Sequence, residues 1–344
     1  MIFFSRDVIT IGSATLDSFL ETELPLVDFP GSPSLKAIAL PFGEKLTAGD
    51  AYFTSGGNAL NAAVTFARQG FKAAPYIVLG DDSPADMILS RLEDERIHSD
   101  LVRFSDRLAT SFSALLLQGG ERTIINYKGA GESLELPDSS RAFRAKFWYI
   151  SLPGKSWKLF PKLVGMAKNR GVKIAFNPSG VHLREGKNSI LKNLRHIDFL
   201  VLNGGEAAEL VGFHPTDSEG AFRRLDKLSS GIVAVTMGGN GCLVSDGSSI
   251  YRVGTFKERK LVDRTGAGDA FGSGFVAGLL RRRECCVRGR IKPENIIYAA
   301  RLASANATSV VEYVGASEGA LYRGEINSER WDKLKIVVEK TKNK

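Results

Sequence analysis

One segment of the sequence combines a carboxylate with a run of small residues in an order that suits phosphate chemistry. It reads Asp263-Arg-Thr-Gly-Ala-Gly-Asp269, and the residues after it predict a helix starting near Asp269. The backbone N–H groups of Gly266, Ala267 and Gly268 would point at an anion over this helix end, where the helix dipole favours negative charge. A carboxylate beside an anion site is explained if it takes a proton from a hydroxyl that attacks phosphorus. The residues alone leave an equal alternative, in which Asp269 only caps the helix and the glycines form a tight turn.

A second glycine-rich segment reads Ser55-Gly56-Gly57-Asn58-Ala-Leu-Asn61. The paired glycines would let the backbone approach a ligand, and Asn58 could cap the helix that follows. Asn61 is a poor choice for a helix interior, so its amide is better explained as a hydrogen-bonding arm toward a polyol. The alternative is a glycine loop with a purely structural role.

Two further turns follow predicted buried strands. The first reads Asn203-Gly-Gly-Glu206 and opens a helix. A carboxylate at a helix start is normally part of a cap, but beside a nucleotide it could order Mg²⁺ and its waters. The second turn follows Thr236 and runs through Gly238 to Gly241, and its flexible backbone suits packing against a nucleotide.

Short apolar runs alternate with longer helical stretches along the chain. Apolar runs bounded by Gly, Asn or Pro are typical of strands that are buried on both faces of a parallel sheet. The alternation predicts a doubly wound α/β domain, in which ligands lie beyond the carboxyl ends of the strands. The strand-like runs are 8–12, 76–80, 147–151, 173–177, 199–203 and 232–237, and the helical stretches include 58–69, 157–169 and 221–229.

Two stretches interrupt this alternation. Residues 18–55 are rich in Pro, Gly and Thr and contain strand-like pieces at 37–40 and 50–54. Residues 110–128 hold two alternating runs separated by Gly119-Gly120, which predicts a β-hairpin. We expect these stretches to form a small β-sheet lid on a core made of 1–17, 56–109 and 129–325. The polar, lysine-rich residues 326–344 are predicted to form a terminal helix that frays.

The overall charge is basic, with 46 Lys and Arg against 38 Asp and Glu, or +8 in total. Most of this charge is scattered, and the one dense cluster is 281–283 with Arg288 and Arg290 close behind. Such a run is usually a solvated helix end, so we expect no nucleic-acid partner. A basic balance also suits an enzyme whose ligands are polyanions.

The cysteines and the hydropathy of the sequence indicate the cellular compartment of the protein. Cys242, Cys285 and Cys286 are an odd number without metal-ligand spacing, which indicates reduced thiols and a reducing compartment. No apolar run approaches the roughly 18 residues that a membrane span needs. The amino-terminal residues lack a charged leader with a cleavage site. We therefore expect a cytoplasmic protein without a membrane partner.

Together the four segments resemble the ribokinase-like, or PfkB, family of carbohydrate kinases. The resemblance extends from residue 9 to about 319, with the segments at 56–61, 203–206, 236–241 and 263–269 in the family's order. It implies a ribokinase-like fold: a doubly wound, mostly parallel sheet with helices on both faces and a small β-sheet lid. It also implies a phosphotransferase that uses ATP and Mg²⁺ to phosphorylate a hydroxyl of a sugar or nucleoside.

The resemblance implies roles for the matched residues as well. The catalytic residues would be Asp269 as the base and Gly266, Ala267 and Gly268 as the anion hole for the migrating phosphoryl group. The substrate-binding residues would be Asp17, Gly56, Gly57 and Asn61. The nucleotide-binding residues would be Asn203, Glu206, Thr236, Gly238, Gly241, Arg264 and Asn306, with Glu206 also reaching Mg²⁺ through water. A site for a monovalent cation such as K⁺ would use Asp263, Thr265 and Gly315, with backbone carbonyls from 310–315.

Two positions depart from the family pattern. Arg264 stands where the family usually has a small residue, and its guanidinium could reach the phosphates of the nucleotide or point to solvent. Gly131 stands where a substrate-binding asparagine often follows Gly-Ala in the family, so a standard ribose or fructose contact is missing.

The substrate therefore stays open between a sugar, a nucleoside (adenosine, cytidine or inosine) and ribose 1-phosphate. A phosphorylated substrate would need a basic residue in the lid or the substrate pocket, and the candidates are Lys45, Arg122 and Lys128. A purine would need apolar or aromatic lid residues, and the candidates are Phe53, Phe112 and Tyr127. A non-catalytic sugar-binding regulator could share this fold, but it could lose Asp269 or the Gly-Ala-Gly turn, and both are present. An exposed apolar lid face would favour a homodimer formed through the lid.

Overall fold

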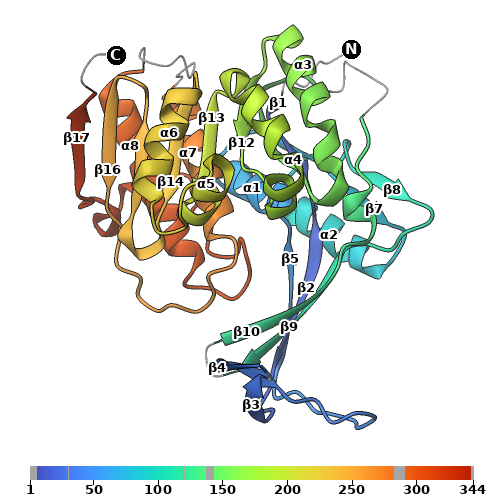
Figure 1. Cartoon of the computed structure of the whole chain (residues 1–344). Helices are drawn as coiled ribbons and strands as arrows, with labels where there is room; N and C mark the ends of the chain where they lie inside the picture. The colour runs from blue at the N-terminus through green and yellow to red at the C-terminus, as the bar shows by residue number, and fades with distance from the viewer. Residues whose placement is uncertain (1–5, 30, 119–120, 137–142, 283–290, 342–344) are drawn as a thin grey trace.

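The computed structural model describes residues 6–29, 31–118, 121–136, 143–282 and 291–341. These residues form an α/β core from which a second, smaller sheet projects (Figure 1). Cys285, Cys286, Arg288, Arg290 and the Gly119-Gly120 turn lie outside the described residues.

The core is built on a nine-stranded sheet whose strands β6, β1, β11, β12, β13 and β14 are parallel. The three strands that follow, β15 to β17, pair antiparallel. In sheet order the strands are β17 (Ile336–Lys340), β16 (Ser249–Val253), β15 (Cys242–Ser245), β14 (Ile232–Thr236), β13 (Phe199–Asn203), β12 (Lys173–Phe176), β11 (Ala145–Ser151), β1 (Arg6–Gly12) and β6 (Ala73–Tyr76).

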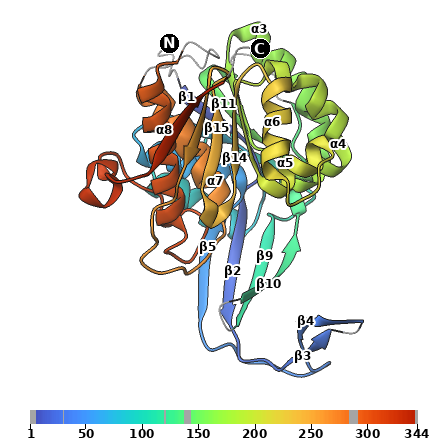
Figure 2. The same cartoon turned by 60° about the vertical axis from the view of Figure 1, so that its left-hand side comes forward.

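Helices cover both faces of this sheet, as Figure 2 shows for α8 on one side and α4 and α5 on the other. One buried cluster contains side chains of α1 (Asn58–Arg68), α2 (Ser83–Asp94), α7 (Ala267–Arg281) and α8 (Pro293–Val310). The opposite cluster contains those of α3 (Phe160–Arg170), α4 (Gly180–Asn193), α5 (Gly204–Val211) and α6 (Ser218–Leu228). Successive strand residues alternate between the clusters, since Phe199 packs in the first and Leu200 in the second. This explains the continuous apolar runs, and the doubly wound architecture is confirmed.

The predicted strands are mostly confirmed, with one division. The run at 76–80 is split between β6 and β7 (Val78–Gly80), and β7 pairs with β8 (Arg103–Ser105) instead of joining the large sheet. Because the parallel strands point the same way, their carboxyl ends lie on the same side of the sheet; for β1, β11 and β13 the last residues are Gly12, Ser151 and Asn203. Polar residues after these strands are thereby gathered around one site.

The smaller sheet, which we call the lid, has the strand order β10-β9-β2-β5. It extends away from the core, with the β3–β4 ribbon at its far end (Figure 1). Its strands are β2 (Thr15–Glu21), β5 (Ala51–Gly56), β9 (Phe112–Gln118) and β10 (Glu121–Tyr127), and the ribbon pairs β3 (Leu26–Phe29) with β4 (Ser32–Ile38). The predicted pairing of two strands on either side of residues 119–120 is confirmed, because β9 and β10 pair antiparallel. Asp17 lies within β2 and is therefore part of the lid sheet.

The prediction of a C-terminal helix is wrong. Residues 325–331 form two short 3₁₀ turns, and β17 then pairs with β16 at the edge of the large sheet. The β-branched run Ile336-Val337-Val338 favours a strand, and the lysines around it are typical of an exposed edge strand. Among the described residues, no helix is both long enough and apolar enough to cross a membrane.

Candidate active site

Asp269 lies in the first turn of α7. The helix is preceded by Gly266, whose φ of 77° is left-handed, and it begins at Ala267. A Cβ on Gly266 would collide with the carbonyl oxygen of Ala316, so this turn requires glycine. Asp269 is the third helical residue, and the helix has no side-chain cap, so the alternative in which Asp269 is the cap is wrong. The N–H groups of this first turn have no partners within the helix. The space beside Gly268 is open, because a Cβ there would meet no atom within 4 Å.

Three asparagine amides surround the Asp269 carboxylate. The Nδ2 of Asn61 donates to Oδ2 at 2.9 Å, and the Nδ2 of Asn58 donates to Oδ1 at 3.1 Å. The Nδ2 of Asn177 also donates to Oδ1, at 3.2 Å. Asn58 was expected to cap α1, but Gly57 is the N-cap residue and the Asn58 side chain turns to Asp269 instead. Asn177 is a residue that sequence reasoning missed; its only signal is its place directly after the buried strand β12.

Burial raises the pKa of Asp269 above its usual range, and the hydrogen bonds from Asn61 and Asn58 oppose that rise. The hydroxyl of Tyr149 is buried beside Gly272 of α7. Burial together with the Asp269 charge raises the pKa of this hydroxyl well above its ordinary value. Burial is also the main reason that the pKa of Glu206 is raised, and the Asp269 charge adds to it. The carboxylate of Asp269 is thus held in a desolvated place by neutral donors.

Asp17 lies on the buried side of the lid, next to the first glycine of the pair. A Cβ on Gly56 would collide with the Asp17 carboxylate, which explains the need for glycine there. Burial raises the pKa of Asp17, while a hydrogen bond from Ser113 opposes the rise. Asn126 of β10 donates to the Ser113 hydroxyl at 2.9 Å, so a polar row crosses the lid at this level. The Oδ1 of Asn61 is buried without a partner among the described residues, and this oxygen could accept a hydrogen bond from a ligand.

A cavity of about 330 Å³ opens on the other side of the glycine turn. This size falls within the range of small-ligand sites. The structure brings together here the expected nucleotide residues Thr236, Gly238, Gly241 and Arg264 with two residues of the anion turn, Ala267 and Gly268. The wall contributed by α8 includes Ser304, Ala307 and Thr308.

The expected role of Asn306 beside the nucleotide is wrong. Its side chain is fully buried, with Nδ2 donating to Ala270 O at 2.8 Å and to Thr65 Oγ1 at 3.2 Å. Its Oδ1 accepts from the backbone N–H of Leu321 at 2.8 Å. Asn306 therefore ties α8 to α7, α1 and the segment after α8, and its polarity is used inside the core.

Asn203 and Glu206 form a capping box at the start of α5. The backbone N–H of Glu206 donates to Asn203 Oδ1 at 2.9 Å, and that of Asn203 donates to Glu206 Oε2 at 2.8 Å. No cluster of three or more His, Cys, Asp and Glu side chains in the described ranges could hold a metal alone. Mg²⁺ is commonly held by one or two carboxylates together with the phosphates of its substrate, and Glu206 could supply one such carboxylate.

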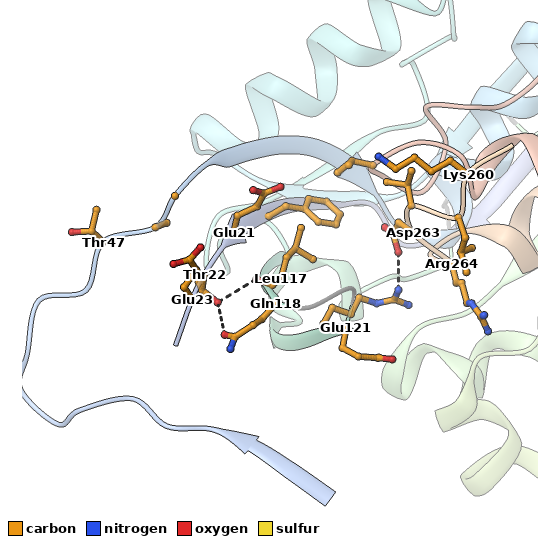
Figure 3. A pocket seen from close by; sticks show the side chains of 17 residues that line it. Glu21, Thr22, Glu23, Thr47, Leu117, Gln118, Glu121, Lys260, Asp263 and Arg264 are labelled. Carbon is orange, nitrogen blue, oxygen red and sulfur yellow. Dashed lines mark hydrogen bonds and ion pairs between the residues drawn. The ribbon is translucent and has the colours of Figure 1, made fainter. Parts of the chain in front are cut away.

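Asp263 connects the anion turn to the lid. Its Oδ1 accepts from the N–H of Thr265 at 2.9 Å, from the hydroxyl of Thr265 at 2.7 Å and from Arg122 Nη1 at 2.7 Å. Figure 3 shows this ion pair beside a cleft of about 1240 Å³ between the lid and the core, which Arg264 also lines. Asp263 Oδ2 is buried without a partner among the described residues, and a bare carboxylate oxygen fits a monovalent cation. Gly315, expected at the same site, packs against Thr54 of β5.

Comparisons with known proteins show which family and which fold this chain resembles. The sequence model of the pfkB family of carbohydrate kinases matches residues 32–321. A cytidine kinase of Thermococcus kodakarensis is 27% identical over 273 residues, which cover 75% of this chain and 90% of that protein. A ribokinase of Mus musculus is 26% identical over 280 residues, which cover 79% and 85%.

Solved structures show the same fold. The ribokinase of Arabidopsis thaliana, complexed with ribose and ATP, matches with a TM-score of 0.74 at 22% identity, over 94% of this chain and 98% of that one. A nucleoside kinase of Methanocaldococcus jannaschii matches with a TM-score of 0.71 at 20% identity, over 95% and 99%.

Proposed function

Because the chain belongs to the PfkB family of carbohydrate kinases, we propose that it transfers the γ-phosphate of ATP to a hydroxyl of a sugar, with Asp269 as the general base. Kinases of this family are phosphotransferases that act on sugar or nucleoside hydroxyls. The observation that carries the assignment is the placement of a buried, amide-bound carboxylate within the first turn of α7. Ala267 and Gly268 of the same turn line the 330 Å³ cavity.

In this proposal the nucleotide occupies the cavity lined by Thr236, Gly238 and Gly241. The N–H groups of residues 266–268 receive the transferred phosphoryl group, because the helix end favours negative charge. Arg264 lines both the cavity and the neighbouring cleft, so its guanidinium can bind the phosphates between them. Mg²⁺, held near Glu206 through water, would neutralise charge between the phosphate oxygens.

The acceptor hydroxyl would lie between Asp269 and the lid. Asp17 can accept hydrogen bonds from two hydroxyls of a polyol, and the free Oδ1 of Asn61 can accept another. Asp269 then takes the proton of the hydroxyl that attacks phosphorus. We propose that the lid excludes water from this reaction, since water would compete for the phosphoryl group. Hydrogen exchange of 111–127 should slow when the true substrate binds, and unchanged exchange would remove closure from the mechanism.

The alternative substrate is a nucleoside. A cytidine kinase is among the relatives of this chain, at 27% identity, which supports a substrate with an attached base. The aromatic candidates differ in position, because Phe53 and Tyr127 are exposed and Phe112 is half-buried. Arg122 is already paired with Asp263, so it favours a phosphorylated substrate less than the sequence suggested.

We also propose that two copies pair through the lid. β10 is the edge strand of the lid sheet, and its Ile124, Ile125 and Tyr127 side chains are exposed. A free edge with apolar side chains is a template for pairing with another chain. Sedimentation of the wild type and of Ile125→Lys would test this: a dimer that the charge dissociates supports it, and a wild-type monomer contradicts it.

The test of function is a panel of sugars and nucleosides with ATP, GTP and ADP as donors, in the presence and absence of EDTA. We expect phosphorylation of one acceptor class, and loss of activity with EDTA that added Mg²⁺ restores. Turnover of a nucleoside but not of any sugar would transfer the assignment to the alternative. No acceptor phosphorylated by any donor, or activity that EDTA leaves unchanged, would contradict the proposed mechanism.

A further inference from the structure

We infer that Asn177 is a positioning residue for the base: together with Asn58 it occupies Oδ1 of Asp269, so that Oδ2 is the oxygen that takes the substrate proton. This inference rests on the proposed function for its consequence, but the arrangement itself can be measured in the free protein. None of the four sequence motifs contains Asn177, which directly follows β12 and donates to the same oxygen of Asp269 as Asn58 of α1.

The count of acceptor positions carries the argument. A carboxylate offers about four lone-pair positions, two on each oxygen. The amides of Asn58 and Asn177 occupy both positions of Oδ1, at 3.1 and 3.2 Å. Among the described residues, Oδ2 accepts a hydrogen bond from Asn61 alone, at 2.9 Å, which leaves one position open on that oxygen. A hydroxyl that approaches Asp269 therefore meets an available acceptor at Oδ2.

Asn177 is held more rigidly than a loop residue would be. Its backbone N–H donates to Ile150 O at 3.0 Å, which extends the parallel ladder beyond β12. Pro178 follows, and a residue before proline is restricted to extended conformations. Ser179 then caps α4 through the N–H of His182. The amide of Asn177 thus projects from a fixed point of the sheet, which is the support that a positioned catalytic group needs.

The amides also decide the charge of the base. Burial alone favours the neutral carboxyl, which cannot accept a proton, and hydrogen bonds donated to the carboxylate favour the ionised form. The titratable groups that face Asp269 are Glu206 of α5, whose negative charge opposes ionisation, and Tyr149 of β11, which stays neutral. The hydrogen bonds from Asn61 and Asn58 lower the pKa of Asp269 against the effect of burial. The amide of Asn177 adds a third donor at 3.2 Å by its position, and it also lowers the pKa of the Tyr149 hydroxyl.

The test is the titration of Asp269 itself, followed by the ¹³Cγ signal of ¹³C-aspartate-labelled protein and assigned by its loss in Asp269→Asn. Asn177→Leu removes the donor and keeps the approximate volume, and Asn177→Ala is a second variant should leucine not fit. We expect the midpoint to move upward by about one pH unit, as expected for a lost hydrogen bond to a charged group. The control is Asn193→Ala, which removes an amide bonded at 2.8 Å to Ser189 O and far from the site; its midpoint should not move.

Kinetics with the acceptor found in the panel give the second readout. The kcat of the Asn177 variants should fall about tenfold on the acid limb of the pH profile and recover as the pH rises, because that limb follows the ionisation of the carboxyl. The KM for ATP should change less than about twofold, since the nucleotide cavity does not include Asn177. An unchanged midpoint with a folded variant overturns the inference. If Asp269→Asn retains turnover, the proposed function fails instead, whatever the Asn177 variants do.

Discussion

The substitution Asp269→Asn should abolish turnover while leaving the fold as stable as before. An asparagine at this position has one carbonyl oxygen and one NH₂ group, so its orientation is decided by the three amides around it. If the NH₂ took the place of Oδ1, it would face the donors of both Asn58 and Asn177. If it took the place of Oδ2, it would face only Asn61.

In the second orientation, the new NH₂ group and the carbonyl oxygen can both have hydrogen-bond partners. The Oδ1 of Asn61 is buried without a partner among the described residues, so a half-turn of the Asn61 amide would present that oxygen to the new NH₂ group. The bonds from Asn58 and Asn177 then remain. Because the pKa of Asp269 is raised in the folded state, its protonated form is the one that stabilises the fold. This contribution to stability is complete below the unfolded-state pKa and is lost as the pH rises through the folded-state pKa. At a pH above the folded-state pKa, the ionised carboxylate therefore destabilises the fold, and a neutral asparagine removes that effect.

We accordingly expect a melting temperature equal to or a few degrees above that of the wild type at pH 7. The kcat should fall by at least about 10²-fold, because the neutral amide cannot take the proton. Scanning calorimetry and steady-state kinetics measure the two quantities, and binding of ATP by calorimetry shows that the nucleotide site is intact. Turnover within tenfold of the wild type would refute the assignment of the base. A melting temperature lowered by more than about 5 °C would refute the description of the amide shell.

Three further predictions concern charged side chains. Arg264→Ala should raise the KM for ATP about tenfold, because the guanidinium lines the cavity. The melting temperature should not change, because this side chain is exposed and forms no ion pair within the described ranges. An unchanged KM would mean that the guanidinium points to solvent. Glu95→Ala should lower the free energy of unfolding by about 3–5 kcal/mol in urea titrations, because the buried Arg68 loses its carboxylate partner at 2.6 Å. A loss below about 1 kcal/mol would contradict this. Arg122→Ala should make activity depend on K⁺ more strongly than in the wild type, because Asp263 loses its counter-charge, and equal K⁺ response in both proteins would argue against a cation at that carboxylate.

The parts of the site that were predictable from the sequence are those built from neighbouring residues. The turn at 266–268 and the carboxylate of Asp269 lie within one helix start, so their order in the sequence already describes their arrangement. The same holds for the hairpin of β9 and β10. Asn177 could not be found this way, because its partner Asp269 is 92 residues further along the chain and no local pattern marks it.

The errors have the same physical origin. A polar residue in a helix near the nucleotide suggested a ligand contact for Asn306, but its partner Thr65 is 241 residues away and lies in the core. Residues 336–340 have a polar, lysine-rich context that suggested a fraying helix, whereas pairing with β16 nearly 90 residues earlier determines their structure. Local composition carries no information on contacts between residues far apart in the sequence, because these contacts form only when the chain folds.

The two interpretations of Asn203 and Glu206 turn out to be compatible. The capping box uses Glu206 Oε2 as the acceptor from the Asn203 N–H, and no hydrogen bond among the described residues uses Oε1. Glu206 is nonetheless drawn out of water, and the negative charge of Asp269 raises its pKa further. Two carboxylates that oppose each other's ionisation are relieved by a cation between them. The cap fixes the direction of the Glu206 carboxylate by one hydrogen bond, from the Asn203 N–H. A fixed carboxylate orders the waters of Mg²⁺ better than a mobile one. The cap therefore supports the proposed magnesium role instead of replacing it.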